Sequence, residues 1–166
     1  MNREIVVIAD NIRSTHNVGS LLRTCEGLGI NKIFLSGYTP YPDTENDKRL
    51  PHIARKLTNK IVKTSLGAET TTNWEYRKDV TKLISELKSK EYEIVAVEIE
   101  KEAIKLNAYK FPKKVAFIFG NERFGIDKKI LSLVDFKVYI PMLGSKESFN
   151  VVQAAAMVLY SARYIY

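Results

Sequence analysis

Short runs of apolar residues alternate along the chain with segments whose apolar residues recur every three to four positions. The runs are typical of buried strands, and the spaced segments are typical of helices that pack one face against a core. The runs predict strands over residues 5–9, 32–36, 93–99, 115–119 and 137–140. The spacing predicts helices over residues 17–28, 79–90, 127–134 and 149–164. This alternation indicates an α/β fold with a mainly parallel sheet flanked by helices.

Glycine, proline and serine mark the expected boundaries of these elements. Gly29 follows the first helical segment, where glycine commonly ends a helix, and Ser148 precedes the last one as its expected N-cap. Residues 37–51 contain three prolines, so we expect an irregular segment there. Because the length suits one hydrophobic core and no repeat or Gly/Ser linker interrupts it, we expect residues 1–166 to form a single domain.

The composition is that of a globular protein with a surplus of positive charge. Lys and Arg number 26 and Asp and Glu number 19, which gives a formal net charge of +7 and suggests a polyanionic partner. The single cysteine excludes an internal disulfide and a cysteine zinc cluster, and two histidines give little support for a metal site. The first residues are not typical of a signal peptide, and no apolar run is long enough to span a bilayer, so we expect a cytoplasmic protein without a membrane partner.

Much of the positive charge lies in residues 48–63, which contain no acidic residue. The basic side chains of this segment are Lys48, Arg49, Arg55, Lys56, Lys60 and Lys63. Such a cluster can bind the phosphates of a nucleic acid, but it can equally be a solvated basic surface. The composition alone leaves both interpretations open.

Three loops that follow expected strands are rich in polar residues and glycine: residues 10–19, 120–125 and 141–150. Ligand sites of open parallel sheets lie at the carboxyl ends of the strands, where such loops gather. Taken singly, each loop has an ordinary structural explanation, since Asn17 can cap a helix and Gly19 can allow close helix packing. None of the loops contains the dinucleotide-binding or P-loop pattern of glycines.

Taken together and in this order, the loops resemble the three motifs of the SpoU (TrmH) family of SPOUT-class RNA methyltransferases. The first motif has Asn-x-Gly and then Arg, and this chain has NVGSLLR over residues 17–23, preceded by Asn11 and closed by Gly29. The second is an apolar strand that continues into Gly-Asn-Glu, here FIFGNERFG over residues 117–125. The third is Ile-Pro-Met-x-Gly with a later Ser and Asn, here IPMLGSKESFN over residues 140–150. The strand order and the length also fit the family over the whole chain.

The resemblance implies a parallel sheet whose C-terminal part, approximately residues 115–166, is tied into a deep trefoil knot. It implies transfer of the methyl group of S-adenosyl-L-methionine to a ribose 2′-hydroxyl of RNA, with tRNA favoured over rRNA and without a metal. The implied catalytic residues are Arg23, Asn17, Glu122, Ser148 and Asn150. Because a guanidinium stays protonated, we expect Arg23 to hold the adjacent phosphate and stabilise the developing alkoxide.

The resemblance also implies which residues hold the cofactor and the RNA. The implied cofactor-binding residues are Gly120, Glu122, Gly125, Ile140, Met142, Gly144 and Phe149. The implied RNA-binding residues are Arg13, His16, Lys48, Arg49, Arg55, Lys56 and Arg123. Glu122 would either anchor Arg23 or contact the cofactor, and the sequence leaves both open.

The family forms homodimers through the knot region, so we expect a homodimer. The last helix carries a stripe of small apolar residues that would serve this interface or the core of the chain: Val151, Ala154, Ala155, Val158, Leu159 and Ala162. Tyr160, Tyr164 and Tyr166 would complete the interface. The sequence does not decide which protomer supplies Arg23 to a given site.

The chain departs from the family pattern at three points. Phe149 replaces the usual Leu, Val152 stands where Ser is frequent, and the stretch between Asn11 and Asn17 is longer than usual. Two other functions remain as alternatives: an RNA-binding protein of the same fold without catalysis, and a knotted methyltransferase that modifies a base. The intact Arg23 and Glu122 argue against the first alternative, and the form of the first and third motifs argues against the second.

Overall fold

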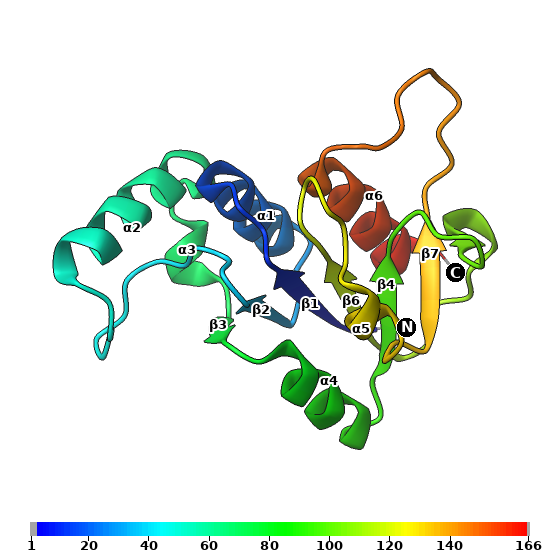
Figure 1. Ribbon diagram of the computed structural model, residues 1–166, viewed down its shortest axis with the longest axis horizontal. Coiled ribbons are helices and arrows are strands. Elements are labelled where there is room, and N and C mark those ends of the chain that lie inside the picture. The colour runs from blue at the N-terminus through cyan, green and yellow to red at the C-terminus, as the bar shows by residue number, and fades with distance from the viewer. Residues whose placement is uncertain (1–2, 166) are drawn as a thin grey trace.

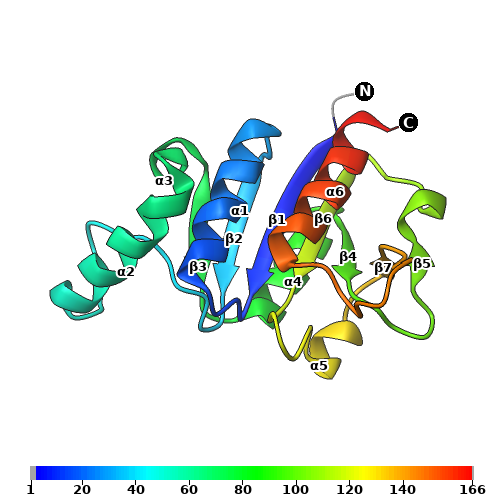
Figure 2. The same ribbon diagram turned by 90° about the horizontal axis from the view of Figure 1, so that it is seen from above.

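The computed structural model describes residues 3–165, and a sheet of seven parallel strands lies at its centre (Figure 1, Figure 2). The strand order is β3-β2-β1-β6-β4-β7-β5, and every strand pairs in parallel with its neighbours. The strands are β1 (Glu4–Asp10), β2 (Lys32–Ser36), β3 (Trp74–Arg77), β4 (Glu93–Val97), β5 (Ile104–Lys105), β6 (Lys114–Phe119) and β7 (Phe136–Tyr139). The predicted α/β fold with a parallel sheet is confirmed.

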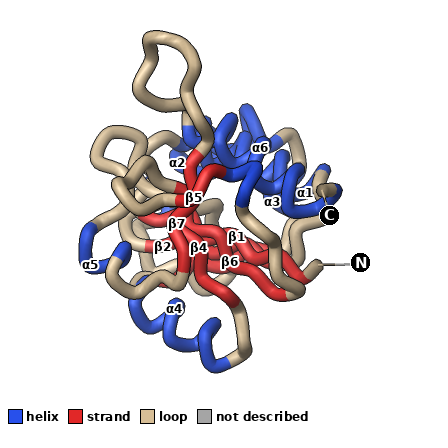
Figure 3. The backbone as a smooth tube through the Cα atoms, turned by 90° about the vertical axis from the view of Figure 1, so that its right-hand side faces the viewer, coloured by secondary structure: helices blue, strands red, loops and turns tan. Residues whose placement is uncertain are grey.

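Helices cover both faces of this sheet. The helices are α1 (Thr15–Gly27), α2 (Pro51–Ser65), α3 (Ala68–Thr71), α4 (Val80–Ser89), α5 (Lys128–Leu131), α6 (Val151–Tyr164) and the 3₁₀ helix η1 (Leu106–Ala108). Helices α1 and α6 lie on one face, and α4 and α5 lie on the other (Figure 1, Figure 3). Helix α2 packs against α1 and extends away from the sheet (Figure 1). No helix among the described residues is long and apolar enough to cross a membrane.

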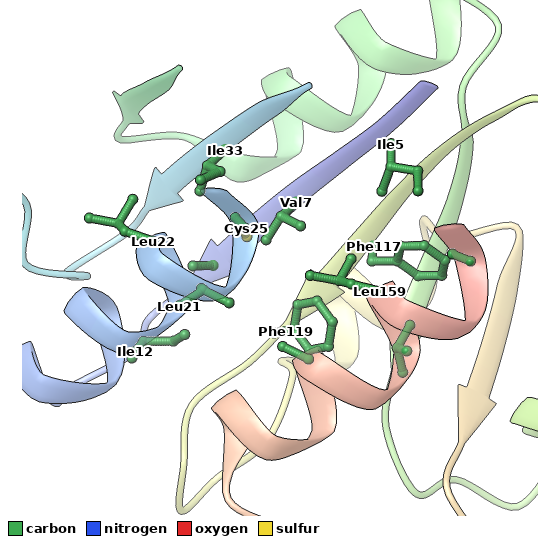
Figure 4. Close-up of a cluster of buried hydrophobic side chains, with 14 of the residues drawn as sticks. Ile5, Val7, Ile12, Leu21, Leu22, Cys25, Ile33, Phe117, Phe119 and Leu159 are labelled. Carbon is green, nitrogen blue, oxygen red and sulfur yellow. The ribbon is translucent and has the colours of Figure 1, made fainter. Parts of the chain in front are cut away.

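Each face of the sheet has its own hydrophobic core, because successive strand residues point to opposite sides. Phe117 and Phe119 of β6 are buried with side chains of α1 and α6, as Figure 4 shows. Ile118, which lies between them in sequence, is buried on the opposite face with side chains of α4 and α5. Coverage of both faces explains why the central strands are continuous apolar runs rather than alternating sequences.

Close packing of α1 on α2 depends on the absence of a side chain at Gly19. A Cβ atom at this position would lie 2.2 Å from the Thr64 hydroxyl oxygen and 2.3 Å from the Ile61 carbonyl oxygen. Real Cβ atoms are not found at such distances, so any larger residue would push the two helices apart. The helix-packing explanation of this motif glycine is therefore confirmed.

Five elements, α2, α3, β3, β5 and η1, were not predicted from the sequence pattern. Helix α2 was missed although its few apolar residues recur at helical spacing, because basic residues dominate the segment and only Ala54, Ile61 and Ser65 are buried. Strand β3 is a half-buried edge strand, and β5 is two residues long. The elements α3, β3 and β5 are all too short to show a clear period.

The predicted N-cap of the last helix was wrong. Helix α6 begins at Val151, and the Asn150 side chain accepts a hydrogen bond of 2.8 Å from the Val152 N–H, which makes Asn150 the cap. Ser148 lies two residues earlier in an exposed loop. Similarly, α1 begins at Thr15 and is capped by Ser14, so Asn17 lies within its first turn.

Most of the small-residue stripe on α6 belongs to the core of the chain. Four of its residues have no exposed surface: Ala155, Val158, Leu159 and Ala162. These residues are therefore excluded from an intermolecular interface, and the stripe gives no support for a dimer. Tyr160 and Tyr164 are each more than half exposed, and Tyr166 lies outside the described residues.

Candidate active site

The three motif loops meet at one edge of the sheet. They follow β1, β6 and β7, and the parallel pairing of these strands brings their carboxyl ends to the same side. The loop of residues 140–150 between β7 and α6 projects from the body of the molecule (Figure 1, Figure 3). Residues separated by more than one hundred positions in sequence therefore contact one another here.

Hydrogen bonds connect one polar residue from each loop. The Asn17 side-chain amide donates to Glu122 Oε1 at 2.9 Å, and Asn17 Oδ1 accepts from Asn150 Nδ2 at 3.3 Å. The backbone N–H groups of Arg13 and Ser14 donate to the two oxygens of Glu122 at 2.9 and 3.0 Å. These five residues line a small pocket at the centre of the site. The second motif is thus attached to the first by three hydrogen bonds to one carboxylate.

These hydrogen bonds keep Glu122 ionised. Partial burial by itself would raise the pKa of Glu122, but the hydrogen bonds from the Arg13 and Ser14 backbone and from Asn17 outweigh it and lower the pKa on balance. A carboxylate with a lowered pKa is a weak base. Glu122 is therefore suited to hold the loops in place rather than to accept a proton.

Asn121 is a second connection that sequence reasoning did not single out. Its side-chain amide donates to the Asn11 carbonyl oxygen at 2.9 Å and to the Tyr38 hydroxyl at 2.7 Å. Its Oδ1 accepts from the backbone N–H groups of Arg123 and Phe124. The signal was present, because Asn121 is the middle residue of the Gly-Asn-Glu motif and is 7% exposed.

Asn11 adopts the left-handed conformation with φ of 56° and organises the first loop. Its Oδ1 accepts from the Tyr38 N–H at 3.1 Å, and its Nδ2 donates to Asp10 at 3.0 Å. Asp10 is 2% exposed and also accepts a bond of 2.7 Å from the Ser36 hydroxyl. Burial raises the pKa of Asp10, although the bonds from Ser36 and Asn11 oppose that shift.

The glycines of the second motif build its tight turn. Gly125 has φ of +68°, and its backbone exchanges two hydrogen bonds with Asn121 at 3.0 and 3.1 Å. A Cβ atom on Gly120 would lie 2.7 Å from the Gly125 carbonyl group, and one on Gly125 would lie 2.4 Å from a Glu98 oxygen. The turn geometry alone explains both glycines.

A second pocket lies between the second and third motifs and the end of β4, and we call it the larger pocket because seventeen residues line it, against five in the first. The volume of each pocket is about 420 Å³. The larger pocket is lined by five of the seven expected cofactor-binding residues: Gly120, Glu122, Gly125, Ile140 and Phe149. Ser148 and Arg123 also line it, whereas Met142 and Gly144 belong to the neighbouring loop and do not. The structure thus brings most of the expected set around one cavity.

Glu98 is a pocket residue that the sequence did not indicate. It follows β4, and its carboxylate accepts hydrogen bonds from the Ile126 N–H at 2.9 Å and the Ile99 N–H at 3.0 Å. These bonds attach the end of the second motif to the end of β4. No sequence pattern distinguishes this glutamate from its exposed neighbours Glu100 and Glu102, because its partners are set by the fold.

Arg23 lies apart from this network. It is exposed on α1, and its side chain has no hydrogen bond or ion pair with any residue that the structure describes. It lines neither the pocket beside Glu122 nor the larger one. Within one copy of the chain Glu122 therefore bonds to Asn17 and to backbone groups, and it does not anchor Arg23.

Most of the expected RNA-binding residues are exposed. Arg13 and His16 lie at the start of α1, Arg123 lies in the second motif, and the others lie before or on α2: Lys48, Arg55 and Lys56. Arg49 differs, because its guanidinium donates to the carbonyl oxygens of Tyr41 and Pro42 at 3.0 and 3.1 Å and pairs with Asp47. Arg49 therefore holds the loop before α2 together, and its donors are not free for phosphate.

No group of three His, Cys, Asp or Glu side chains within residues 3–165 is arranged to hold a metal ion. The buried Cys25 lies in the core on α1, where burial raises the pKa of its thiol. Neither feature adds a chemical group to the site.

Two known enzymes are similar to this chain in sequence. A tRNA (guanosine(18)-2′-O)-methyltransferase from Aquifex aeolicus is 27% identical over 164 residues, which cover 97% of this chain and 69% of that protein. The enzyme of the same name from Thermus thermophilus is 27% identical over 163 residues, which cover 96% of this chain and 74% of that protein.

Solved structures show the same fold. A TrmH/SpoU tRNA modifying enzyme from A. aeolicus superposes with a TM-score of 0.79 at 24% identity and covers 98% of this chain and 75% of its own. An AdoMet-bound rRNA methyltransferase from Sinorhizobium meliloti superposes with a TM-score of 0.81 at 20% identity. The match covers 98% of this chain and 57% of the Sinorhizobium chain. This chain thus spans little more than half the length of the latter protein. Residues 4–160 match the SpoU rRNA Methylase family, and the chain therefore belongs to that family.

Proposed function

We propose that this chain transfers the methyl group of S-adenosyl-L-methionine to a ribose 2′-hydroxyl of RNA, with tRNA as the substrate. The observation that carries the proposal is the hydrogen-bonded series Glu122–Asn17–Asn150, which joins all three motifs beside a pocket of nucleoside size. The names of the Aquifex and Thermus relatives support ribose methylation and favour tRNA over rRNA.

The larger pocket fits the chemistry of this cofactor. Ile140, Phe149 and Ile99 offer apolar surface for a base, and Phe149 is 39% exposed at the pocket. Within residues 3–165, the backbone of residues 141–149 forms no hydrogen bond with another backbone group, so its donors and acceptors are available to a ligand. We infer that the backbone of residues 140–149 binds the edge of the cofactor's adenine. Gly120, Gly125 and Glu122 would border the opposite end of the cofactor.

The residues around the small pocket would position the ribose. When bound, S-adenosyl-L-methionine supplies an electrophilic methyl group, so the reaction chiefly needs alignment of the 2′-hydroxyl. Asn17 and Asn150, held by Glu122 and by the start of α6, offer fixed amide groups for that alignment. Ser148 lines the larger pocket, which lies beside these two residues. Glu122 is a positioning residue in this scheme, because its oxygens are already occupied by three donors.

We propose that Arg23 acts on the site of a second copy in a homodimer. Its guanidinium is exposed and lies outside both pockets of its own chain, and it would hold the adjacent phosphate and stabilise the developing alkoxide. Tyr160 and Tyr164 are 56% and 54% exposed and adjacent, with ring centroids 5.0 Å apart, and would contribute to the interface.

Two inactive variants test this arrangement. Arg23→Ala and Asn150→Ala copies are mixed, and the methyl-transfer rate is compared with that of each variant alone. If Arg23 serves the other copy, a mixed dimer contains one intact site, and up to about a quarter of wild-type activity returns. No recovery in dimers shown by native mass spectrometry to have exchanged subunits would contradict the proposal. Arg23→Ala alone should keep S-adenosylhomocysteine binding.

We also propose that residues 115–165 form the trefoil knot typical of the family. The sheet order supports it, because β6 lies between β1 and β4, and β7 lies between β4 and β5. The later strands are thus inserted between earlier ones, an arrangement that is compatible with such a knot.

The proposed RNA surface consists of exposed cations on both sides of the site. Its members are Arg13, His16, Lys48, Arg55, Lys56 and Arg123. Arg49 is omitted because its donors bind the loop before α2. Helix α2 carries Arg55 and Lys56 away from the sheet, where they would contact backbone phosphates at a distance from the reacting ribose.

Calorimetric titration with S-adenosyl-L-methionine and S-adenosylhomocysteine tests the cofactor assignment. We expect binding in the micromolar range, which corresponds to about −8 kcal/mol. Phe149→Ala should weaken the binding of both ligands, whereas Phe136→Ala, at a phenylalanine of similar exposure that does not line the pocket, should not. Absence of binding to the folded wild type would favour an RNA-binding protein without catalysis.

A further inference from the structure

A third pocket of about 400 Å³ lies beside the proposed reaction site and has no part in the scheme above. We call it the aromatic pocket, and it is lined mainly by Tyr38, Tyr41, Tyr76, Pro40, Leu57 and Arg13. The three tyrosine rings can contact a flat aromatic ring of a ligand. The arginine can contact the face of that ring or a negatively charged group next to it.

One wall of this pocket is rigid. The rings of Tyr41 and Tyr76 are stacked with centroids 4.2 Å apart, and the Arg49 guanidinium lies 3.6 Å from the Tyr41 ring centroid. The Tyr76 hydroxyl donates to the Gly37 carbonyl oxygen at 2.7 Å. A ligand entering here would not have to order these side chains, because intramolecular contacts already fix them.

Tyr38 offers an aromatic ring to the solvent in a fixed orientation. It is 59% exposed, yet its hydroxyl accepts a bond of 2.7 Å from Asn121 and its backbone N–H bonds to Asn11 at 3.1 Å. The tip of the ring is thereby attached to the second motif and its base to the first. An exposed aromatic ring held at both ends is suited to stacking on a base.

Arg13 connects this pocket to the proposed reaction site. It lines both the aromatic pocket and the small pocket that contains Asn17, Glu122 and Asn150. Its backbone N–H is fixed by Glu122, and its side chain is exposed. A nucleic acid strand with a ribose in the small pocket would therefore pass Arg13 on its way to the tyrosines, and its phosphate would meet the guanidinium there.

We propose that the aromatic pocket binds an unpaired nucleobase of the substrate RNA, with Tyr38 as the stacking surface and Arg13 as the phosphate contact. The proposal rests on the proposed function, since it assumes that an RNA strand presents its ribose to the small pocket. Unpaired bases are the part of an RNA whose faces are open for stacking on aromatic side chains. The pocket would thus select a strand that is locally unpaired at the methylated site.

Two short probes test the stacking directly. One is a single-stranded RNA of mixed sequence, and the other is a ribose-phosphate oligomer of the same length without bases, so that their charge is equal. Fluorescence anisotropy measures the affinity of each for wild type, Tyr38→Phe and Tyr38→Ala. Wild type and Tyr38→Phe should prefer the RNA by at least about fivefold, the lower limit for one stacked base. Tyr38→Ala should lose that preference and keep its affinity for the probe without bases.

Kinetics with unfractionated tRNA provide the second measurement. Tyr38→Ala should raise KM at least about fivefold with little change in kcat, while Tyr38→Phe, which loses only the bond to Asn121, should resemble wild type. If Tyr38→Phe is as impaired as Tyr38→Ala, the hydroxyl bond matters rather than the ring, and the proposal is wrong. An unchanged base preference in Tyr38→Ala would also overturn it.

These outcomes separate the pocket from the proposed function. If wild type neither binds S-adenosylhomocysteine nor methylates tRNA, the enzyme assignment fails, whatever the probes show. If wild type methylates tRNA and Tyr38→Ala does so with the same KM and the same base preference, only the aromatic pocket proposal fails.

Discussion

Replacement of Glu122 by Gln should weaken the connection between the first two motifs. The carboxylate accepts bonds of 2.9, 3.0 and 2.9 Å from Arg13, Ser14 and Asn17. Gln keeps one acceptor oxygen, but its NH₂ group would face at least one of these donors. Each exposed bond contributes about 0.5–1 kcal/mol, so we expect a loss of about 1–2 kcal/mol in the free energy of unfolding. For a chain of this size that loss lowers Tm by about 2–8 °C.

Differential scanning calorimetry measures this change, with Glu102→Gln as the matched control. Glu102 is exposed and its side chain has no hydrogen bond or ion pair among residues 3–165, so this control removes the same charge without breaking a bond. A Tm of Glu122→Gln equal to that of the control would refute the role assigned to the carboxylate. The cofactor affinity of the variant should also fall, because the second motif borders the larger pocket.

The pH dependence of this difference has a defined sign. The pKa of Glu122 is lowered from its ordinary 4.5 in the folded protein, so the carboxylate contributes stability above pH 4.5. That contribution is lost as the pH falls through the lowered pKa, where protonation removes one acceptor. The difference in Tm between wild type and Glu122→Gln should therefore be constant near neutral pH and shrink in acid. A Tm difference that grows in acid would show that the ionised carboxylate does not stabilise the fold through these hydrogen bonds.

Two further predictions concern the RNA surface and the packing of α2. Joint replacement of Lys48, Arg55 and Lys56 by Ala should weaken tRNA binding and reduce the slope of log K against log salt by about 0.7–0.9 for each phosphate that the variant no longer neutralises. The exposed Lys82→Ala on the opposite face of the sheet is the control, and an unchanged slope in the triple variant would make the cluster ordinary surface. Gly19→Ala should destabilise the fold by about 1–3 kcal/mol, because its Cβ would overlap α2. An unchanged denaturant midpoint would show that the helices separate without cost.

Strands and helices were predictable where a strand is buried on both faces or a helix is buried on one face. Strand β6 is covered on both faces, so its apolar run is unbroken, and α4 has one buried face, so its period is clear. Helix α2 is different, because much of its surface is exposed, as the exposure of Ile53 and Val62 shows. Pro51 at its first turn was the available sign of a helix start.

The motif loops were predictable as a group, but their contacts were not. Glu122 and Asn17 are 105 positions apart, and only the strand order, which no local pattern encodes, brings them together. The same holds for Glu98 and Asn121, whose roles depend on partners from other loops. The basic composition indicated a polyanion-binding surface, yet Arg49 is engaged by Asp47 two residues away, so charge counting overestimates the free cations.

Analysis of the reaction product decides whether this chain transfers a methyl group to a ribose. Unfractionated tRNA is incubated with the protein and isotopically labelled S-adenosyl-L-methionine, digested to nucleosides and examined by mass spectrometry, with Arg23→Ala as the inactive control. We expect label in nucleosides whose sugar is heavier by one methyl group and whose base mass is unchanged. Label in the base, or no transfer by a protein that binds S-adenosylhomocysteine, would contradict it.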